Sequence, residues 1–256
     1  MNAELTAKKG IDSNTLKLIA ITAMTLDHLT WALVPGLSRE WYAIALHIIG
    51  RLTAPIMWFF IAEGCFHTRN IKKYVLRLAA FAFISHFCYC FAFGIPFVPF
   101  TRGIVNQTGV MLPLALAAAL IGVHFDRFQT KFSPAVKVLA IIAACLIAFP
   151  ADWSSIAVMA PLFIFLHHEN RAKQALDIVI WSAVYAAVYF IFLDKLYGIL
   201  QLFTALSIPL LMRYNGERGS SRLKLKWFFY IYYPAHLLAV GIIRLALYGD
   251  ISLIFR

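Results

Sequence analysis

"LKLIAITAMTLDHLTWALV", Leu16–Val34, is an apolar stretch that contains an acidic and a basic side chain side by side, Asp27 and His28. A helix needs roughly 20 mostly apolar residues to cross a bilayer, because the hydrocarbon core is about 30 Å thick. The stretch is long enough to do so. It therefore predicts a transmembrane helix with ionisable groups inside it.

Similar apolar stretches recur along the whole chain of 256 residues, which is 62% hydrophobic and only 14% charged. A soluble domain of this length would need far more charged surface. We predict an all-α fold, a polytopic integral membrane protein that forms a single domain over residues 1–256 and has about nine transmembrane helices, within a range of about 8–10. The fifth, sixth and eighth predicted spans are short. The predicted spans are 16–34, 41–62, 73–94, 104–123, 135–150, 153–167, 175–193, 197–212 and 226–247.

The formal net charge of +11 follows this predicted topology. Of the 23 Lys and Arg residues, 17 fall in the N-terminal segment or at the span ends on its side of the membrane. The other side carries only Arg39, Arg102, Lys195 and Arg256. Because positive residues stay in the cytoplasm, the N-terminus is expected to be cytoplasmic. Anionic lipid headgroups are the expected partners of this charge, and nucleic acid is not.

Neither the cysteines nor the histidine pair of "LHHEN" predicts a metal site. Cys65, Cys88, Cys90 and Cys145 lie in or beside spans without metal-ligand or disulfide spacing. The two histidines of "LHHEN", Leu166–Asn170, are adjacent, so they do not share a helix face. We expect no metal, and we interpret the cysteines as small packing residues.

Ionisable residues inside the predicted spans are the strongest functional signal. Each costs about 2.5–3.5 kcal/mol at the centre of a membrane helix, so each calls for a partner or a role. Counting about 1.5 Å per residue from the span ends places four of them in one overlapping slab. The residues in this slab are His28, Arg51, His86 and His236.

The spacing within the first two spans predicts how the buried groups pair. Asp27 and His28 are adjacent and point about 100° apart, so each needs its own partner from another helix. Arg51 is the expected counter-ion of Asp27. In "HIIGRLTAP", His47–Pro55, Gly50 leaves room beside Arg51, and Pro55 frees the Arg51 carbonyl.

These residues admit a structural as well as a functional interpretation. Asp27 and Arg51 can form a clamp between two spans as readily as part of a site, and His86 and His47 are more typical of structural hydrogen bonding. His28 and His236 favour function, since a neutral histidine is a general base near pH 7. Tyr232 lies four residues before His236 and therefore on the same helix face.

Three stretches carry a resemblance to a known family: "LKLIAITAMTLDHLTW", "IIGRLTAPIMWFFIAEGCFHTRNIKKYVLRL" and "KWFFYIYYPAHLLAVGII". In order they present a D-H pair, G-R-x-x-x-P and F-Y-x-x-Y-P-x-H, and the chain is similar to the TraX family over nearly its whole length. That family is named for N-acetylation of conjugal-transfer pilin and is similar to the broader transmembrane acyltransferases, such as acyltransferase-3. The resemblance implies a protein of the bacterial inner (cytoplasmic) membrane. It also implies acetyl transfer from cytoplasmic acetyl-CoA to an amine or hydroxyl of a membrane-associated acceptor, such as a pilin-like peptide or a small amine or glycan.

The same resemblance implies a role for each matching residue. His28 would be the general base, with His236 as a second candidate. Asp27 would orient Arg51, which would stabilise an oxyanion or hold part of the donor. The residues expected to contact substrate are Tyr232, Tyr233, His86 and Asn106, with the cluster Arg69, Lys72, Lys73 and Arg77 at the phosphates of CoA.

Two functions from other classes compete with acetyl transfer. A proton-coupled membrane transporter also uses Asp, His and Arg inside spans, and an internal repeat would favour it. A non-catalytic membrane assembly factor would need the polar cluster only to hold its helices together. Binding of acetyl-CoA would count against both.

Overall fold

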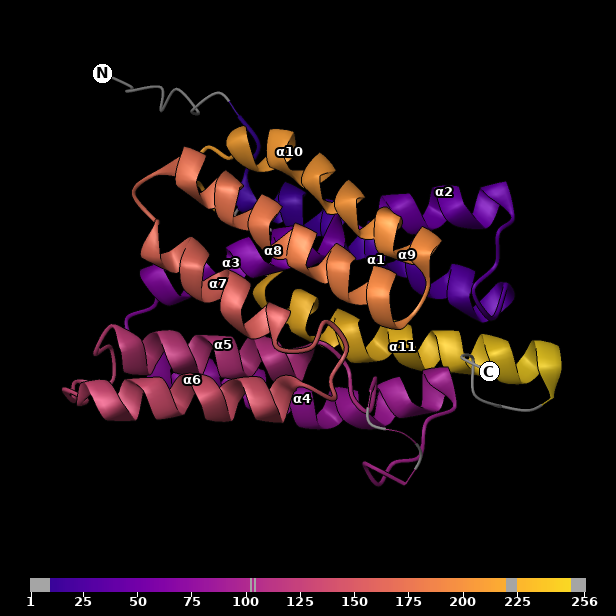
Figure 1. Ribbon diagram of the computed structural model, residues 1–256, viewed down its shortest axis with the longest axis horizontal. Helices are drawn as coiled ribbons and strands as arrows, with labels where there is room; N and C mark the ends of the chain where they lie inside the picture. Colours follow the sequence, from indigo (N-terminus) through magenta and orange to yellow (C-terminus); the bar gives the residue numbers. More distant parts are fainter. Residues whose placement is uncertain (1–9, 102, 104, 220–224, 250–256) are drawn as a thin grey trace, which may run out of the picture.

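The computed structural model describes residues 10–101, 103, 105–219 and 225–249. Within this part of the chain the regular elements are helices, which run roughly along one long axis (Figure 1). They are α1 (Ser13–Leu33), α2 (Trp41–Gly50), α3 (Thr53–His67), α4 (Ile71–Phe93), α5 (Met111–His124), α6 (Pro134–Ala148), α7 (Ile156–Leu166), α8 (Arg171–Phe192), α9 (Lys195–Leu200), the 3₁₀ helix η1 (Gln201–Ser207), α10 (Ile208–Met212) and α11 (Leu225–Tyr248).

The predicted all-α membrane architecture is confirmed. Every predicted span coincides with a helical segment, and six segments are long and apolar enough to cross a membrane. These six are 13–33, 41–67, 71–93, 171–192, 195–212 and 227–248. The prediction of which spans are short was wrong in two places. The eighth predicted span lies in an 18-residue segment and is therefore not short. The fourth begins only at Met111 and is short, like the fifth and sixth, which correspond to α6 and α7.

Side-chain caps define where several helices begin. Asp12, Asn70 and Asn170 each accept a hydrogen bond from the backbone N–H three residues later, at 2.9, 2.9 and 3.0 Å. Such caps satisfy N–H groups that have no partner inside the helix. Inside a helix the backbone N–H and C=O groups bond to one another, which is what a segment surrounded by lipid requires.

Two of the long segments are interrupted next to the candidate functional site. The helix from Trp41 to His67 breaks after Gly50, where Pro55 removes the N–H that would bond to the carbonyl of Arg51. The segment 195–212 tightens into 3₁₀ geometry, and there the Thr204 hydroxyl bonds back to the carbonyl of Gln201 at 2.7 Å. A 3₁₀ stretch in the middle of a helical segment often marks a hinge or a strained sequence.

Two connections, 94–110 and 149–155, explain why α5, α6 and α7 are short. They meet in an isolated parallel bridge between Thr108 and Ala151. The N–H of Gln107 bonds to the carbonyl of Pro150 at 2.6 Å, and that of Asp152 bonds to the carbonyl of Thr108 at 2.8 Å. Non-helical backbone at membrane depth is tolerated where it lines a cavity, and these connections do so.

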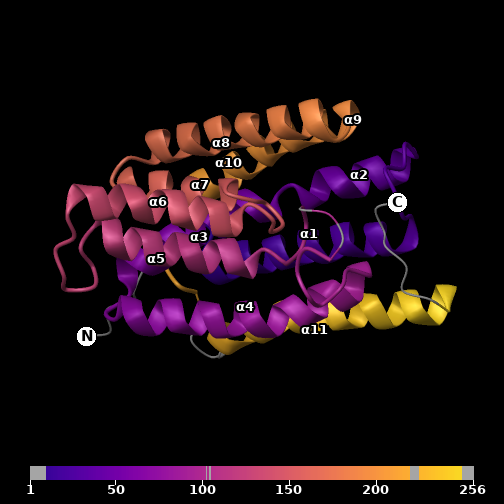
Figure 2. The same ribbon diagram turned by 60° about the horizontal axis from the view of Figure 1, so that its bottom comes forward.

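The helix ends gather into two groups, one at each end of the bundle (Figures 1 and 2). The end that we name the basic end contains residues 10–14, 67–71, 124–134, 166–171 and 212–219. The distal end contains the connections 34–40, 94–110 and 193–195. Helix α11 packs along α4 and α1, which places the last helix beside the first, as the site requires.

Candidate functional site

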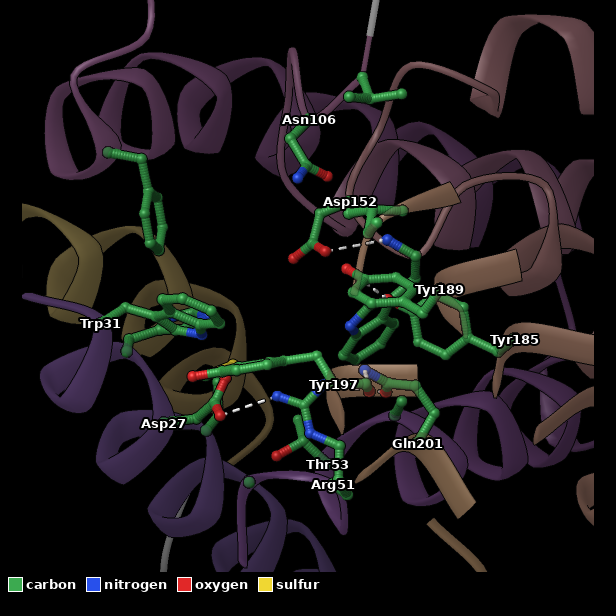
Figure 3. A pocket seen from close by; sticks show the side chains of 18 of the residues that line it. Asp27, Trp31, Arg51, Thr53, Asn106, Asp152, Tyr185, Tyr189, Tyr197 and Gln201 are labelled. Carbon is green, nitrogen blue, oxygen red and sulfur yellow. Dashed lines mark hydrogen bonds and ion pairs between the residues drawn. The ribbon is translucent and has the colours of Figure 1, made fainter. Parts of the chain in front are cut away.

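Asp27 on α1 is the centre of a hydrogen-bond network that fixes Arg51. Its Oδ1 atom accepts from Nδ1 of His47 at 2.8 Å and from NH2 of Arg51 at 2.8 Å. The other guanidinium nitrogens of Arg51 donate to Oε1 of Gln201 at 3.0 Å and to the carbonyl of His47 at 3.1 Å. The predicted Asp27–Arg51 pair is confirmed (Figure 3), and every guanidinium nitrogen of Arg51 has a partner.

Gly50 lets α1 approach the broken helix closely enough for this pairing. A Cβ atom at Gly50 would lie 2.5 Å from both Cβ and Oδ1 of Asp27, a distance that real contacts do not reach. The hydroxyl of Thr53, just after the break, donates to the carbonyl of Ala20 on α1 at 3.0 Å. The G-R-x-x-x-P motif therefore supplies three features within a short segment: Gly50 allows the close contact, Arg51 is the cation, and Pro55 breaks the helix.

His28 pairs with His236. Because His28 and Asp27 are adjacent and point about 100° apart on α1, His28 was expected to find a partner of its own on another helix. Nδ1 of His28 lies 2.8 Å from Nε2 of His236, and Nδ1 of His236 lies 3.1 Å from the carbonyl of Tyr232. A carbonyl only accepts, so Nδ1 of neutral His236 carries the proton, and its Nε2 accepts from Nδ1–H of His28. Nε2 of His28 is then left with a lone pair. This assignment of tautomers follows from the hydrogen bonds.

Two tyrosines of α11 hold this pair in place from either side. The Tyr232 hydroxyl is hydrogen-bonded to the Thr25 hydroxyl at 2.7 Å, and its ring stacks on His236 at 5.4 Å between centroids. The Tyr233 hydroxyl accepts from the N–H of Val110 at 3.2 Å. The motif F-Y-x-x-Y-P-x-H on α11 thus places the hydroxyl of Tyr232 against α1 and that of Tyr233 against the start of α5.

The Asp27–Arg51 network lines a cavity of about 520 Å³ that opens at the distal end, which we name the distal cavity (Figure 3). Residues of the three connections at that end, such as Leu37, Val105 and Leu193, form its mouth. Its polar and aromatic wall comprises Asp27, His28, Trp31, Arg51, Thr53, Tyr89, Phe93, Asn106, Gln107, Asp152, Trp153, Tyr185, Tyr189, Tyr197, Gln201 and Thr204. A volume of this size is typical of a small-molecule site.

A second cavity, of about 560 Å³, opens at the other end and is named the basic-end cavity. Three cations line it: Lys17, Arg77 and Arg218. Arg77 lies 5.1 Å from the ring centre of Tyr230, and Lys17 lies 4.6 Å from that of Phe60. The cavity therefore combines positive charge with aromatic faces.

The acidic member of the basic-end wall is Glu63, which is 4% exposed. Its carboxylate lies 2.9 Å from Nε2 of His168 and 3.3 Å from Nε2 of His67. Histidines of two segments thus surround this carboxylate at the edge of the cavity, and Arg171 lies 3.9 Å from it.

The two cavities share a wall made by Met24 and Trp153, the two residues that line both. Met24 lies one helical turn before His28 on α1. From the other side, Tyr233 lines the basic-end cavity and its ring contacts that of His236 at 5.4 Å. The histidine pair therefore lies where the cavities come closest.

Comparison with known proteins identifies the family. The TraX protein family matches residues 12–244. The chain belongs to the TraX family. It is also 31% identical over 229 residues to a probable fimbrial assembly protein FimC, serogroup H1, of Dichelobacter nodosus, over 87% of this chain and 91% of that protein. No solved structure matches.

Seven of the residues that the TraX resemblance singled out lie at one of the two cavities or directly behind His28. Asp27, His28, Arg51 and Asn106 line the distal cavity, while Tyr233 lines the basic-end cavity. His236 and Tyr232 stand behind His28.

His86 and three of the four predicted phosphate-binding cations line neither cavity. Nε2 of His86 donates to the carbonyl of Phe97 at 2.8 Å, and its Nδ1 accepts from Thr108 at 3.1 Å, so this side chain holds the connection 94–110. Arg69, Lys72 and Lys73 are exposed at the basic end. Of that cluster, Arg77 alone lines the cavity, because it lies on the face of α4 that meets α11.

One residue that supports the candidate site matches its predicted role. His47, which we interpreted as structural, is 1% exposed and bonds directly to Asp27. Gln201, which bonds to Arg51, gave no signal in the sequence, because it comes from an irregular helix whose position depends on the fold.

Charged groups outside the spanning helices have shifted acidities. Asp152 lies in the connection between α6 and α7, where burial raises the pKa of its carboxyl to about 6. At the basic end, a hydrogen bond from Lys137 lowers the pKa of Asp126. The burial of Asp152 thus acts against its negative charge, so a cation beside it would be stabilising.

Proposed function

We propose that this chain is an integral-membrane acetyltransferase of the bacterial inner membrane. It would bind acetyl-CoA in the basic-end cavity and transfer the acetyl group to an amine or hydroxyl of an acceptor in the distal cavity. The observation that carries the proposal is the meeting of two oppositely opening cavities at a wall beside His28 and His236.

The basic-end cavity suits the donor by its charge and its position. Lys17, Arg77 and Arg218 would meet the phosphates of CoA, which is a polyanion. The pantetheine arm would then extend inward along the apolar wall, which includes Met57 and Leu114, and carry the thioester toward the wall shared with the distal cavity. The positive-inside rule predicts that this end faces the cytoplasm, where acetyl-CoA is found.

His28 would act as the general base from the distal side of that wall. Its Nε2 lone pair would take a proton from the acceptor nitrogen or oxygen as that atom attacks the thioester carbon. Collapse of the tetrahedral intermediate would break the C–S bond, and the imidazolium would return the proton to the departing sulfur. The products are the acetylated acceptor and CoA, so atoms and charge balance.

Arg51 would act electrostatically, as a fixed cation near the developing oxyanion. Its bonds to Asp27 and Gln201 hold the guanidinium in one orientation, so little reorganisation is needed during the reaction. His236 would position His28 and stabilise its charged form by sharing a hydrogen bond with it. We therefore propose that Asp27 positions Arg51 and does not itself contact the reacting atoms.

The acceptor is proposed to be a pilin-like peptide, because the similar protein of D. nodosus is named as a probable fimbrial assembly protein. That name equally suits a non-catalytic assembly factor. Opposed cavities around a buried ion pair are also compatible with a proton-coupled transporter. These two alternatives predict no specific binding of acetyl-CoA.

The first experiment measures acetyl-CoA binding by calorimetry on the purified protein in detergent. We expect binding by the native chain and weaker binding by Arg77→Gln and Arg218→Gln. Lys173→Gln, which removes an exposed cation of the same end, is the matched control and should bind like the native chain. A folded native protein that does not bind acetyl-CoA or CoA would refute the proposal and direct attention to proton flux in liposomes.

The second experiment follows radiolabelled acetyl-CoA into acceptors in bacterial membranes that contain the protein. His28→Ala should retain donor binding and lose transfer by a factor of roughly 10²–10⁴, the usual contribution of general base catalysis. His124→Ala, outside both cavities, controls for the loss of a histidine. Undiminished transfer by His28→Ala would exclude the proposed role.

A further inference from the structure

The two cavities lie in line along the bundle, and the lining residues change from one cavity to the other at one level. On α1, Ile21 lines the basic-end cavity, Met24 lines both, and His28 lines the distal cavity. On α3 the same change takes place between Ala54 on the distal side and Met57 on the basic-end side. A group that passes from one cavity to the other must therefore cross this level.

Met24 and Trp153 form the barrier at that level, since they line both cavities. We name this pair of side chains the septum. Met24 is buried on α1, whereas Trp153 belongs to the connection between α6 and α7. The septum thus brings together two segments that are distant in sequence, and its shape depends on how firmly each side chain is held.

Trp153 is the rigid member of the septum. Its N–H donates to Oδ1 of Asp152 at 3.0 Å, and its carbonyl accepts from the N–H of Ala157 at 3.2 Å. Its ring contacts the fully buried ring of Trp58 edge to face, at 6.3 Å between centroids. The backbone of Trp153 is left-handed, with φ of 62°, which is uncommon for a bulky residue and is typical of functional sites. An indole held in this way cannot move aside without disturbing the packed core.

Met24 is the adaptable member, because a methionine side chain is unbranched and fits its shape to its neighbours. In the proposed reaction the thioester enters from the basic-end cavity, and His28 acts from the distal cavity. The acyl chain leads the donor toward the distal side, so it meets the septum before the thioester carbon does. Close-packed side chains have little room for additional methylene groups, so the septum tests the length of the acyl chain.

We propose that Met24 and Trp153 select the acyl group of the donor: they leave room for an acetyl group to reach the distal side and exclude longer chains such as butyryl. This inference rests on the proposed function and deepens it by naming the residues that determine donor specificity. Acetyl transfer can stand while the inference fails, because the two make different demands on the same assay.

The test compares transfer of radiolabelled acetyl and butyryl groups from their CoA thioesters to acceptors in bacterial membranes that contain the full chain. We expect the native protein to transfer acetyl at least about 10-fold faster than butyryl, the usual size of discrimination by an apolar pocket. Trp153→Gly should raise the butyryl-to-acetyl ratio by about 10-fold or more. Glycine adopts the left-handed conformation readily, so this variant removes the indole and relieves the backbone at once.

The ratio of the two rates does not depend on how much protein is folded, which separates selectivity from stability. Trp181→Ala removes an indole outside both cavities and should keep the native ratio. Met24→Ala places a good helix former in α1 and should raise the ratio in the same direction, so it decides the question if Trp153→Gly does not fold.

The outcomes distinguish the inference from the proposed function. Transfer of neither group by the folded native protein would refute the proposed function, and the inference with it. Equal transfer of acetyl and butyryl by the native protein would overturn the inference alone. A native ratio in folded Trp153→Gly would also overturn it, while leaving acetyl transfer in place.

Discussion

Separating Asp27 from Arg51 should destabilise the fold, and the size of the effect follows from their contacts. Replacing Asp27 with Leu leaves Arg51 bonded only to Gln201 and to the carbonyl of His47, and leaves Nδ1–H of His47 without its acceptor. Removing one partner of a buried ion pair costs about 3–5 kcal/mol.

The expected loss lies near the lower end of that range. The side chains of Arg51 and Asp27 are 13% and 12% exposed, toward a cavity that water can enter. Two of the three Arg51 hydrogen bonds also survive in Asp27→Leu. We therefore expect a decrease of about 3 kcal/mol in the free energy of unfolding for Asp27→Leu, and a similar decrease for Arg51→Met.

The double variant Asp27→Leu/Arg51→Met distinguishes a real pair from two independent residues. It removes both charges, and such replacements by apolar residues of similar volume are often close to neutral. The double variant should therefore be more stable than the sum of the single losses predicts, by at least about 2 kcal/mol. The assay is reversible unfolding in mixed micelles, followed by circular dichroism.

Additivity would refute this reasoning. If the losses of the two single variants sum to that of the double variant within about 0.5 kcal/mol, the pair does not couple α1 to the broken helix. The Asp27 network would then not be what orients Arg51.

Three further predictions address other contacts. Gly50→Ala should lower the free energy of unfolding by about 1–3 kcal/mol in the same assay, because its Cβ would overlap Asp27; a neutral effect would show that α1 can move away at no cost. Tyr233→Phe removes the acceptor of the Val110 N–H and should cost about 1–3 kcal/mol and speed exchange of that amide, whereas unchanged exchange would contradict the hydrogen bond. The pKa of Asp152 is raised by burial to about 6, so its protonated form stabilises the fold fully below its ordinary pKa of 3.8, and that stabilisation is lost as the pH rises through about 6. The melting temperature of the native protein should accordingly fall relative to Asp152→Asn between about pH 5 and 7, and a parallel pH profile for the two would exclude the shift.

The amino-acid sequence was sufficient to predict the helices and the ionisable residues within them. Apolar length alone located each helical segment, although not where it begins, ends or breaks, since a chain in lipid must satisfy its backbone groups within each segment. Adjacency alone required Asp27 and His28 to find different partners, and both did so. The basic residues predicted which helix ends lie together.

Other features depended on long-range contacts that have no local signal. The start of α5 at Met111 is set by pairing between residues 105–110 and 149–152, which are distant in sequence. Apolar composition could not reveal it, because the residues before Met111 are compatible with a helix. Which cations line the basic-end cavity likewise depended on which face of α4 meets α11. The sequence could not distinguish Arg77, which lines the cavity, from the exposed Arg69, Lys72 and Lys73.

The sequence by itself therefore determined the class of protein, the helices and the identity of the buried acid, base and cation, because membrane insertion penalises each such residue wherever the chain places it. Only the tertiary structure decided that two cavities meet beside His28 and His236, and that Asp152 and Gln201 line one of them. The physical reason is that a cavity is a property of how several helices pack, and the side chains that line it come from segments whose proximity is fixed by that packing.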